Sequence, residues 1–196
     1  MLKAFQKIGR ELFLQGLNNS HSGNLSIRQG DRIFITRRGS MLANLTEEDI
    51  IETGIEKNDS NITLASTEII VHRAIYQNTS ALAIVHCHPP YAIALSLIED
   101  DIIPIDSEGC YLFRKVPVLK SEYTIGSREV AKGASKILKK YRLIMIKGHG
   151  CIAIGQLLEE AYQWASSLEH SSKIIYITRT MKPDFTYEKT KDYRKW

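Results

Sequence analysis

The sequence predicts an α/β fold of three layers, in which helices cover both faces of a largely antiparallel central sheet. Apolar runs bounded by turn residues alternate along the chain with segments whose apolar residues recur at helical spacing. The apolar runs come as hairpin-like neighbours, whereas a parallel sheet needs a regular alternation of strand and helix. No G-x-G-x-x-G turn follows the first strand and no G-x-x-x-x-G-K loop occurs, so dinucleotide-binding and P-loop folds are not expected.

The size and composition of the chain favour one compact domain. With 196 residues, of which 43% are hydrophobic, the chain is long enough to bury a sizeable core. We expect a single domain over residues 1–181 and a C-terminal tail over 182–196. No apolar stretch approaches the roughly 18 to 20 residues of a membrane span, and charges interrupt the opening segment, unlike a signal peptide. The expected location is therefore the cytoplasm, with no membrane as a partner.

Charge and cysteine content narrow the classes of partner. The net charge is +4, and residues 182–196 carry five Lys or Arg against three acids. No basic face with interleaved aromatic residues accompanies this tail, so nucleic acid is not expected as a partner. The three cysteines are too few, and odd in number, for a disulfide framework, which fits free and buried thiols in a reducing compartment.

The order of the expected elements follows from these patterns. The opening residues, 1–17, predict an amphipathic helix, and residues 25–36 predict a β-hairpin around a Gln-Gly-Asp turn. Thr46 precedes acidic residues suited to a short capped turn. Further helices are expected over 67–78, 91–98, 127–141 and 158–181, and further strands over 81–88, 115–119 and twice within 143–155. Pro183 ends the last helix.

Two histidines stand where a buried strand is expected to end. In "IVHCHPP", His86 and His88 are two positions apart, and residues at this spacing in a strand point to the same face. Two imidazoles on one side form half of a metal site. The alternative is that they are two polar residues at a strand terminus, each with its own hydrogen-bond partners.

A third histidine, His149, lies between two glycines where two later strands are expected to meet. The glycines allow a tight turn and remove side chains that would crowd an ion. In isolation, this residue is an ordinary turn histidine. Combined with His86 and His88, it completes the three neutral imidazoles that a tetrahedral Zn²⁺ site with an open fourth position requires.

A carboxylate, Glu68, is expected in the first turn of the helix over 67–78. The helix dipole favours its charged form there, and Ser66 and Thr67 lie beside the outward-pointing N–H groups. Two alternatives remain open. Glu68 could be a plain N-terminal helix acid paired with Arg73 on the surface, or it could form a two-ligand unit with His72, four residues later on the same helical face.

Six motifs together resemble the class II aldolase/adducin family. They are "GNLSIR" (23–28), "ITRRG" (35–39), "LTEEDI" (45–50), "STEIIVHRAIY" (66–76), "VHCHPPYAIALS" (85–96) and "KGHG" (147–150), in the order and spacing of that family. Each motif is weak alone, whereas six in order are specific, and the match runs over about residues 1–180.

The resemblance implies a role for each matching residue. His86, His88 and His149 look like the family's zinc ligands, where Mn²⁺ or Co²⁺ could replace zinc, and Glu68 looks like its catalytic acid/base, which can also ligate the metal. The positions that hold the substrate phosphate fall on Gly23, Asn24, Gly39, Ser66 and Thr67. The implied partners are a small sugar phosphate and further copies of the chain in a homotetramer.

The implied reaction is cleavage of a ketose 1-phosphate, similar to fuculose 1-phosphate, to dihydroxyacetone phosphate and a small aldehyde through a zinc-stabilised enediolate. A pentulose-5-phosphate 4-epimerase or a sugar-phosphate dehydratase could use the same metal site. A non-catalytic adducin-like scaffold is a third alternative from a different class.

Two departures from the family pattern bear on the substrate. The second phosphate loop reads Thr36-Arg37-Arg38-Gly39, and either arginine could contact phosphate, although we expect at least one to be a surface residue. The family's proton-donating tyrosine would fall at Ser107-Glu108, with Tyr111 the nearest phenol. The tail residues Tyr187 and Tyr193 are alternative donors from an adjacent chain.

Overall fold

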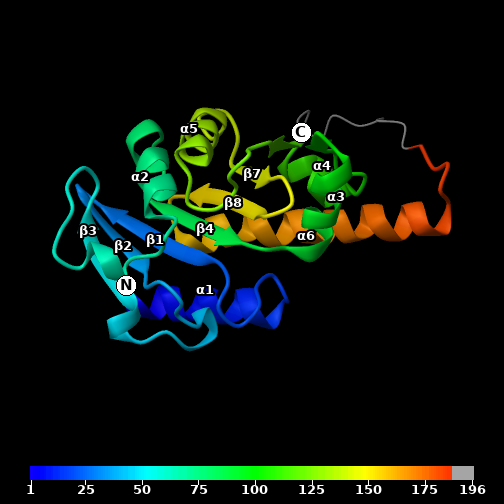
Figure 1. The fold of residues 1–196 in the computed structure, drawn as a ribbon. Coiled ribbons are helices and arrows are strands. Elements are labelled where there is room, and N and C mark those ends of the chain that lie inside the picture. Colours follow the sequence, from blue (N-terminus) through cyan, green and yellow to red (C-terminus); the bar gives the residue numbers. More distant parts are fainter. Residues whose placement is uncertain (187–196) are drawn as a thin grey trace.

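The computed structural model describes residues 1–186, which form an eight-stranded sheet between two layers of helices (Figure 1). The strand order is β3-β2-β1-β4-β8-β7-β6-β5, and all neighbours are antiparallel except β6 and β7. The strands are β1 Asn24–Gln29, β2 Arg32–Thr36, β3 Ile50–Gly54, β4 Ala83–Cys87, β5 Asp101–Ile102, β6 Val116–Leu119, β7 Leu143–Ile146 and β8 Gly150–Gly155. The predicted three-layer, largely antiparallel fold is confirmed.

The helices divide between the two faces of the sheet. In Figure 1, α1 lies below the sheet, and α2 and α5 lie above it. Helix α6 packs against α1 and against strands β8 and β4. The short helices α3 and α4 pack against α6, and α3 also contacts the sheet. The helices are α1 Leu2–Leu14, α2 Ile69–Asn78, α3 Pro90–Ile98, α4 Ser107–Leu112, α5 Arg128–Ile137 and α6 Leu158–Met181, with short 3-10 turns η1 Leu42–Asn44, η2 Glu47–Asp49 and η3 Ile62–Leu64.

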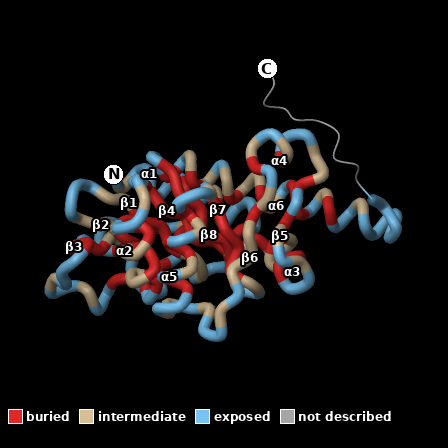
Figure 2. The backbone as a smooth tube through the Cα atoms, turned by 90° about the horizontal axis from the view of Figure 1, so that it is seen from above, coloured by how far each residue is buried: buried red, intermediate tan, exposed pale blue. Residues whose placement is uncertain are grey.

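Two hydrophobic cores lie on the two faces because side chains of the central strands alternate between them. In β4, Val85 and Cys87 join the core under α1 and α6, whereas Ile84 joins the core under α2 and α5. Every residue of β4 is buried, which explains why this strand reads as one apolar run. Figure 2 shows the buried residues concentrated along the middle of the molecule.

Several boundaries differ from those expected. Strands β3 and β5 and helix α4 were not predicted. Strand β5 has two residues and α4 six, too few for a clear apolar period, and β3 begins within the motif that was assigned to the capped turn. Helix α1 ends at Leu14, since Gly16 takes a left-handed conformation (φ 68°) and returns the chain toward the sheet. The capped turn at Thr46 is confirmed, with Asp49 completing a capping box. Within residues 1–186, no helix has both the length and the apolar character to cross a membrane.

Helix α1 provides a matched test of the core under α1 and α6. Phe5 is fully buried there, whereas Phe13 on the same helix is 44% exposed. We expect Phe5→Ala to lower the free energy of unfolding by about 3 to 5 kcal/mol, because it leaves a cavity. Phe13→Ala should cost far less. Urea unfolding of both variants measures the difference, and equal losses would contradict the assigned packing of α1.

Candidate metal centre and active site

One end of the sheet gathers the segments that carry the predicted site residues. The start of β1 pairs with the end of β4, so that Asn24 lies opposite His86. The end of β4 pairs in turn with the start of β8, through Cys87 and Cys151. Because antiparallel neighbours place the start of one strand beside the end of the next, residues distant in sequence meet at this edge.

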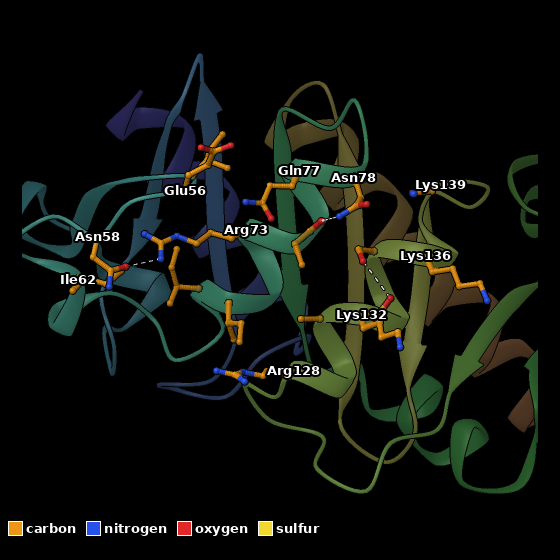
Figure 3. Close-up of a pocket in the computed structure, with 16 residues that line it drawn as sticks. Glu56, Asn58, Ile62, Arg73, Gln77, Asn78, Arg128, Lys132, Lys136 and Lys139 are labelled. Atoms are coloured by element: carbon orange, nitrogen blue, oxygen red, sulfur yellow. Dashed lines mark hydrogen bonds between the residues drawn. The ribbon is translucent and has the colours of Figure 1, made fainter.

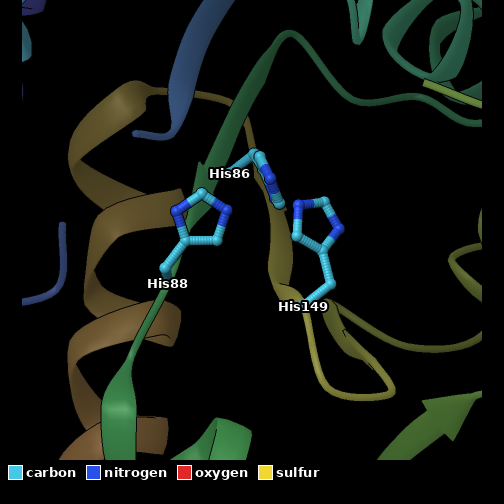
Figure 4. A group of neighbouring side chains, drawn as sticks. All are labelled: His86, His88 and His149. Atoms are coloured by element: carbon cyan, nitrogen blue, oxygen red, sulfur yellow. The ribbon is translucent and has the colours of Figure 1, made fainter. Parts of the chain in front are cut away.

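The three predicted histidines converge at this edge (Figure 4). Their candidate ligand nitrogens all lie within 4.8 Å of one another. The ring centroids of His86 and His88 are 4.8 Å apart, and His149 lies 4.9 Å from His86 and 5.0 Å from His88. His86 belongs to β4, His88 follows its last residue, and His149 lies in the turn between β7 and β8, as expected.

Hydrogen bonds leave one nitrogen of each ring available. Nδ1 of His86 lies 2.9 Å from the carbonyl oxygen of Cys151, so this nitrogen carries the proton and Nε2 keeps its lone pair. Nε2 of His88 and Nδ1 of His149 are buried without a hydrogen-bond partner among the described residues. Such orphaned nitrogens are rare in folded proteins, and their convergence on a third imidazole indicates a shared ligand site rather than ordinary structural histidines.

The electrostatics of the site favour neutral imidazoles. Burial is the main cause that lowers the pKa of His86 well below its usual value, and the proximity of His88 and His149 adds to it. Burial lowers the pKa of His88 to about 4 and also lowers that of His149. Since a metal ion binds only the deprotonated ring, the three rings are in their binding form at neutral pH.

The glycines beside His149 make the room that the sequence predicts. Gly148 has a φ of 68°, which accommodates the tight turn. A Cβ atom on Gly150 would lie 2.6 Å from Cδ2 of His88 and 3.1 Å from Cε1 of His86. Any other residue at position 150 would therefore displace the two rings. The donor set of three neutral imidazoles fits a divalent ion such as Zn²⁺.

Glu68 is buried at the N-terminus of α2, at the helix cap rather than in the first turn. The residue is 4% exposed, and its Oε1 accepts a hydrogen bond of 2.7 Å from the Gly126 N–H. Its Oε2 is buried without a partner among the described residues. Burial raises the pKa of Glu68, and the Gly126 hydrogen bond partly offsets this rise. A buried carboxyl with one free oxygen and a raised pKa is typical of a general acid/base.

Of the two alternatives for Glu68, the surface pair with Arg73 is wrong. Arg73 does not pair with it, because the guanidinium donates to the carbonyls of Gly54 and Lys57. The two-ligand unit with His72 stays a prediction. Nδ1 of His72 lies 2.6 Å from the Ser26 hydroxyl, its Nε2 is buried without a partner among the described residues, and His72 is outside the cluster of three histidines found in residues 1–186.

The predicted phosphate-binding residues lie at the same end of the sheet. Gly23 (φ 76°) approaches His86 so closely that a Cβ would lie 2.7 Å from its carbonyl oxygen, and Asn24 has a buried Oδ1 without a partner in the described chain. Ser66 donates its N–H to the Thr36 carbonyl at 3.1 Å, which joins the end of β2 to the segment before α2.

The remaining two predicted phosphate residues are more open to solvent. Thr67 follows Ser66 and is exposed. Gly39 is exposed in the turn after β2, with φ 70° and open space where a side chain would lie. Arg37, two residues before it, donates to the Asp49 carboxylate at 2.9 Å, which matches the expectation that at least one arginine of this loop has a surface role. Tyr111 is 63% exposed on α4, and the tail residues Tyr187 and Tyr193 lie outside the described residues.

The comparisons with known proteins agree on one family. The profile described as Class II Aldolase and Adducin N-terminal domain matches residues 3–176. The chain belongs to the class II aldolase and adducin family. An L-fuculose phosphate aldolase of Methanococcus maripaludis is 32% identical over 184 residues, 92% of this chain and 99% of that protein. The solved l-fuculose-1-phosphate aldolase from Thermus thermophilus superposes with a TM-score of 0.88 at 34% identity, covering 94% of this chain and 96% of that one.

The family also contains relatives with another reaction. A 3-oxo-tetronate 4-phosphate decarboxylase of Pectobacterium atrosepticum is 29% identical over 178 residues, 87% of this chain and 81% of that protein. Membership of the class II aldolase and adducin family is thus shown, whereas the members named by these comparisons differ in the bond that they break.

Three residues that support the candidate site were not predicted from the sequence. Oδ1 of Asn18 accepts the N–H of His88 at 3.1 Å. The Glu169 carboxylate on α6 accepts the N–H groups of Tyr91 and Ala92 at 3.0 Å each and so fixes the start of α3, two residues after His88. Gly126 donates to Glu68. All three act through the backbone or across long sequence separations, where no local motif marks them.

A separate groove of about 970 Å³ lies between α2 and α5 (Figure 3). Its apolar floor includes Ile69 and Ala131, and Lys132 and Lys136 stand at its rim. Arg73 in this groove donates to Asn58 at 2.7 Å. None of the three site histidines, nor Glu68, lines it. The groove is therefore distinct from the candidate active site of this class II aldolase family member.

The ligand set predicts the metal content of one histidine variant. We expect His86→Ala to lose stoichiometric zinc, because two imidazoles hold the ion far less tightly than three. His21→Ala, which alters an exposed histidine outside the cluster, should retain it. Elemental analysis after dialysis measures both, and stoichiometric zinc in His86→Ala would show that the ligand set is wrong.

The buried His72 predicts a pH dependence of stability. Burial lowers its pKa from 6.5 to about 3, so between these values the unfolded chain binds a proton that the folded chain excludes. Its contribution is therefore complete above pH 6.5 and is lost as the pH falls toward 3, at up to about 1.4 kcal/mol per pH unit.

The variant His72→Asn should lose this part of the slope in urea unfolding between pH 7 and 5. The exposed His170→Asn variant is the control and should keep the wild-type slope. Identical pH slopes for wild type and His72→Asn would contradict the neutral, buried state of this imidazole.

Proposed function

We propose that this protein is a metal-dependent sugar-phosphate aldolase that cleaves a ketose 1-phosphate, similar to fuculose 1-phosphate, to dihydroxyacetone phosphate and a small aldehyde. The observation that carries the proposal is the convergence of three imidazole nitrogens at the end of the sheet where the buried Glu68 also lies. The relatives named L-fuculose phosphate aldolase, at 32% and 34% identity, support the substrate class.

The metal is proposed to be Zn²⁺, with Mn²⁺ or Co²⁺ as substitutes. His86, His88 and His149 would hold it, because each presents one nitrogen to the cluster. A divalent ion bound there would act as a Lewis acid on the substrate carbonyl and stabilise the negative charge of an enediolate. The Cys151 carbonyl fixes the orientation of His86 and so leaves its Nε2 for the metal.

Glu68 is proposed to move the proton. Its Oε1 is held by Gly126, so the free Oε2 is the oxygen available to a substrate carbon. In the cleavage direction, Glu68 would deliver a proton to the carbon from which the aldehyde has left, and in synthesis it would remove that proton. A raised pKa brings the carboxyl closer to the operating pH, which suits both directions of transfer.

Gly23, Asn24, Gly39, Ser66 and Thr67 are proposed to bind the phosphate. They supply N–H groups, a side-chain amide and hydroxyls, and they offer no acidic side chain to repel an anion. Backbone hydrogen bonds join the segment 64–67 to the end of β2 and the residues after it. Ser66 and Thr67 therefore keep a fixed spacing from Gly39. The phosphate would therefore position the sugar relative to Glu68.

A decarboxylase is the second candidate, because relatives with that printed name match most of the chain. Loss of carbon dioxide from a 3-oxo acid leaves the same kind of charge beside a carbonyl as carbon-carbon cleavage does, so an identical metal and acid could serve both reactions. The 4-epimerase and dehydratase alternatives would also use this centre.

We further propose the homotetramer that the resemblance implies, in which an exposed phenol such as Tyr111 is available to a neighbouring copy.

Product analysis of the zinc-loaded protein tests the proposal. We expect dihydroxyacetone phosphate from at least one ketose 1-phosphate, with fuculose and rhamnulose 1-phosphates as the first substrates. Ribulose 5-phosphate tests for epimerisation, and 3-oxo-tetronate 4-phosphate tests for carbon dioxide release. If no ketose 1-phosphate yields triose phosphate, the aldolase proposal is wrong.

The variant Glu68→Gln tests the assigned acid/base. Turnover should fall by roughly 10² to 10⁴-fold, because an amide cannot transfer the proton, while stoichiometric zinc stays bound. Glu159→Gln changes an exposed carboxylate at the start of α6 and serves as the control, with activity near that of the wild type. Near-normal turnover in Glu68→Gln would exclude Glu68 as the acid/base.

A further inference from the structure

The segment between β6 and α5, residues 120–127, contacts both the histidine cluster and the acid/base. The Gly126 N–H donates to Oε1 of Glu68 at 2.7 Å. The backbone of Thr124 lies close enough to the ring of His149 to raise the pKa of this imidazole as a hydrogen-bond partner, although burial lowers it more. Two residues with different proposed roles are thus held by backbone groups only two positions apart in the chain.

The Thr124 contact determines which nitrogen of His149 faces the cluster. A backbone partner that raises the pKa of an imidazole is a carbonyl that accepts a ring N–H. Since Nδ1 of His149 has no partner among the described residues, the nitrogen that donates to Thr124 is Nε2. The contact therefore directs Nδ1, with its lone pair, toward His86 and His88. Partners of this kind fix the tautomer and the ring orientation of a metal-binding histidine.

The Gly126 contact orients Glu68 in the same way. It is the one hydrogen bond recorded for the Glu68 side chain within residues 1–186, and it engages Oε1 while Oε2 stays free. Rotation of the carboxyl group would therefore be limited mainly by this N–H and by the surrounding packing. Without it, the carboxyl would be a buried group with neither oxygen satisfied, which is costly.

Position 126 allows little besides glycine. Its φ is 56°, in the left-handed region, and a Cβ atom would lie 2.9 Å from the carbonyl oxygen of Thr67. The neighbouring Tyr123 and Ile125 are 67% and 66% exposed, so this part of the chain is not held by buried side chains. Its close approach to Glu68 depends on the backbone conformation.

The two ends of the segment are fixed to rigid elements. The Glu129 carboxylate on α5 accepts the Ser121 hydroxyl at 2.8 Å and the Glu122 N–H at 3.1 Å. At the other end, the Ser127 side chain caps α5 by accepting the Val130 N–H at 3.0 Å. The backbone groups at 124 and 126 are therefore presented from a segment tied at both ends.

We propose that residues 124–126 form a positioning strap that sets His149 for metal binding and Glu68 for proton transfer at the same time. Metal affinity and the proton-transfer step then depend on one three-residue stretch of backbone. The assignment of these two tasks rests on the proposed function, whereas the two contacts themselves do not.

The variant Gly126→Ala, compared with Gly30→Ala, tests the strap. Both glycines have positive φ, but Gly30 lies in the β1–β2 turn with open space where a side chain would lie. For Gly126→Ala we expect zinc affinity to fall by roughly 10 to 100-fold, with an altered visible spectrum of the Co²⁺-substituted protein. With substrate, kcat should fall, because Glu68 loses the contact that orients it. KM should also rise, because the added Cβ would lie 2.9 Å from the carbonyl oxygen of the proposed phosphate-binding residue Thr67. Gly30→Ala should match the wild type in every readout.

Zinc affinity and kcat at wild-type levels in a folded Gly126→Ala protein would overturn the proposal. If this variant does not fold, hydrogen–deuterium exchange of residues 120–127 decides the matter in Glu68→Gln and Glu68→Ala. The amide of Gln can still accept the Gly126 N–H, so exchange should stay slow in Glu68→Gln and accelerate in Glu68→Ala. Equal exchange in the two variants would overturn the strap.

The readouts separate this inference from the proposed function. A protein that turns over no sugar phosphate, yet shows weaker zinc binding in Gly126→Ala and faster exchange in Glu68→Ala, would refute the aldolase proposal and support the strap. Normal aldolase activity in both the wild type and Gly126→Ala would support the aldolase proposal and refute the strap.

Discussion

The pairing of β4 with β1 on one side and β8 on the other is the constraint on which the site depends. It places His86 between Asn24 and Ile152 and directs its ring toward the face covered by α2. A slip of one residue in either pairing would turn His86 toward α6 and bring Cys87 into its place, since strand side chains alternate between faces. The apolar neighbours Ile84, Val85 and Ile154 oppose such a slip, because each fits only one of the two cores.

Burial gives the site a consistent electrostatic character. It lowers the pKa of the three imidazoles and raises that of Glu68, so each of these groups is shifted toward its uncharged form. A divalent cation among the imidazoles would favour the ionised carboxylate again, because opposite charges at short range stabilise each other in a poorly solvated site. With a metal bound, its affinity and the ionisation of Glu68 would be linked through the charge of the ion.

Local sequence patterns were sufficient for the principal elements and for the cluster of three histidines, but not for the contacts that hold these side chains in place. A local pattern predicts the geometry of each of the three histidines. His86 and His88 are two residues apart in a strand, and His149 lies between two glycines in a turn. Gly126 contacts the Glu68 carboxylate across 58 residues of sequence. Glu169 contacts two backbone N–H groups that are 77 and 78 residues away. Such contacts depend on how helices cross the sheet, which no short motif encodes. Strand β5 was missed for a simpler reason, since its two residues are too few to show any periodicity.

The attachment of Glu68 and His149 to main-chain atoms has a consequence for how related enzymes can diverge. The strap makes its contacts through the backbone at 124 and 126. The exposed side chains of Tyr123 and Ile125 therefore take no part in the contacts to Glu68 and His149. Substitutions of these two exposed side chains would change the surface beside the strap and leave its backbone contacts in place. Related proteins could in this way differ in the substrate that they prefer while the residues corresponding to Glu68 and the three histidines stay the same.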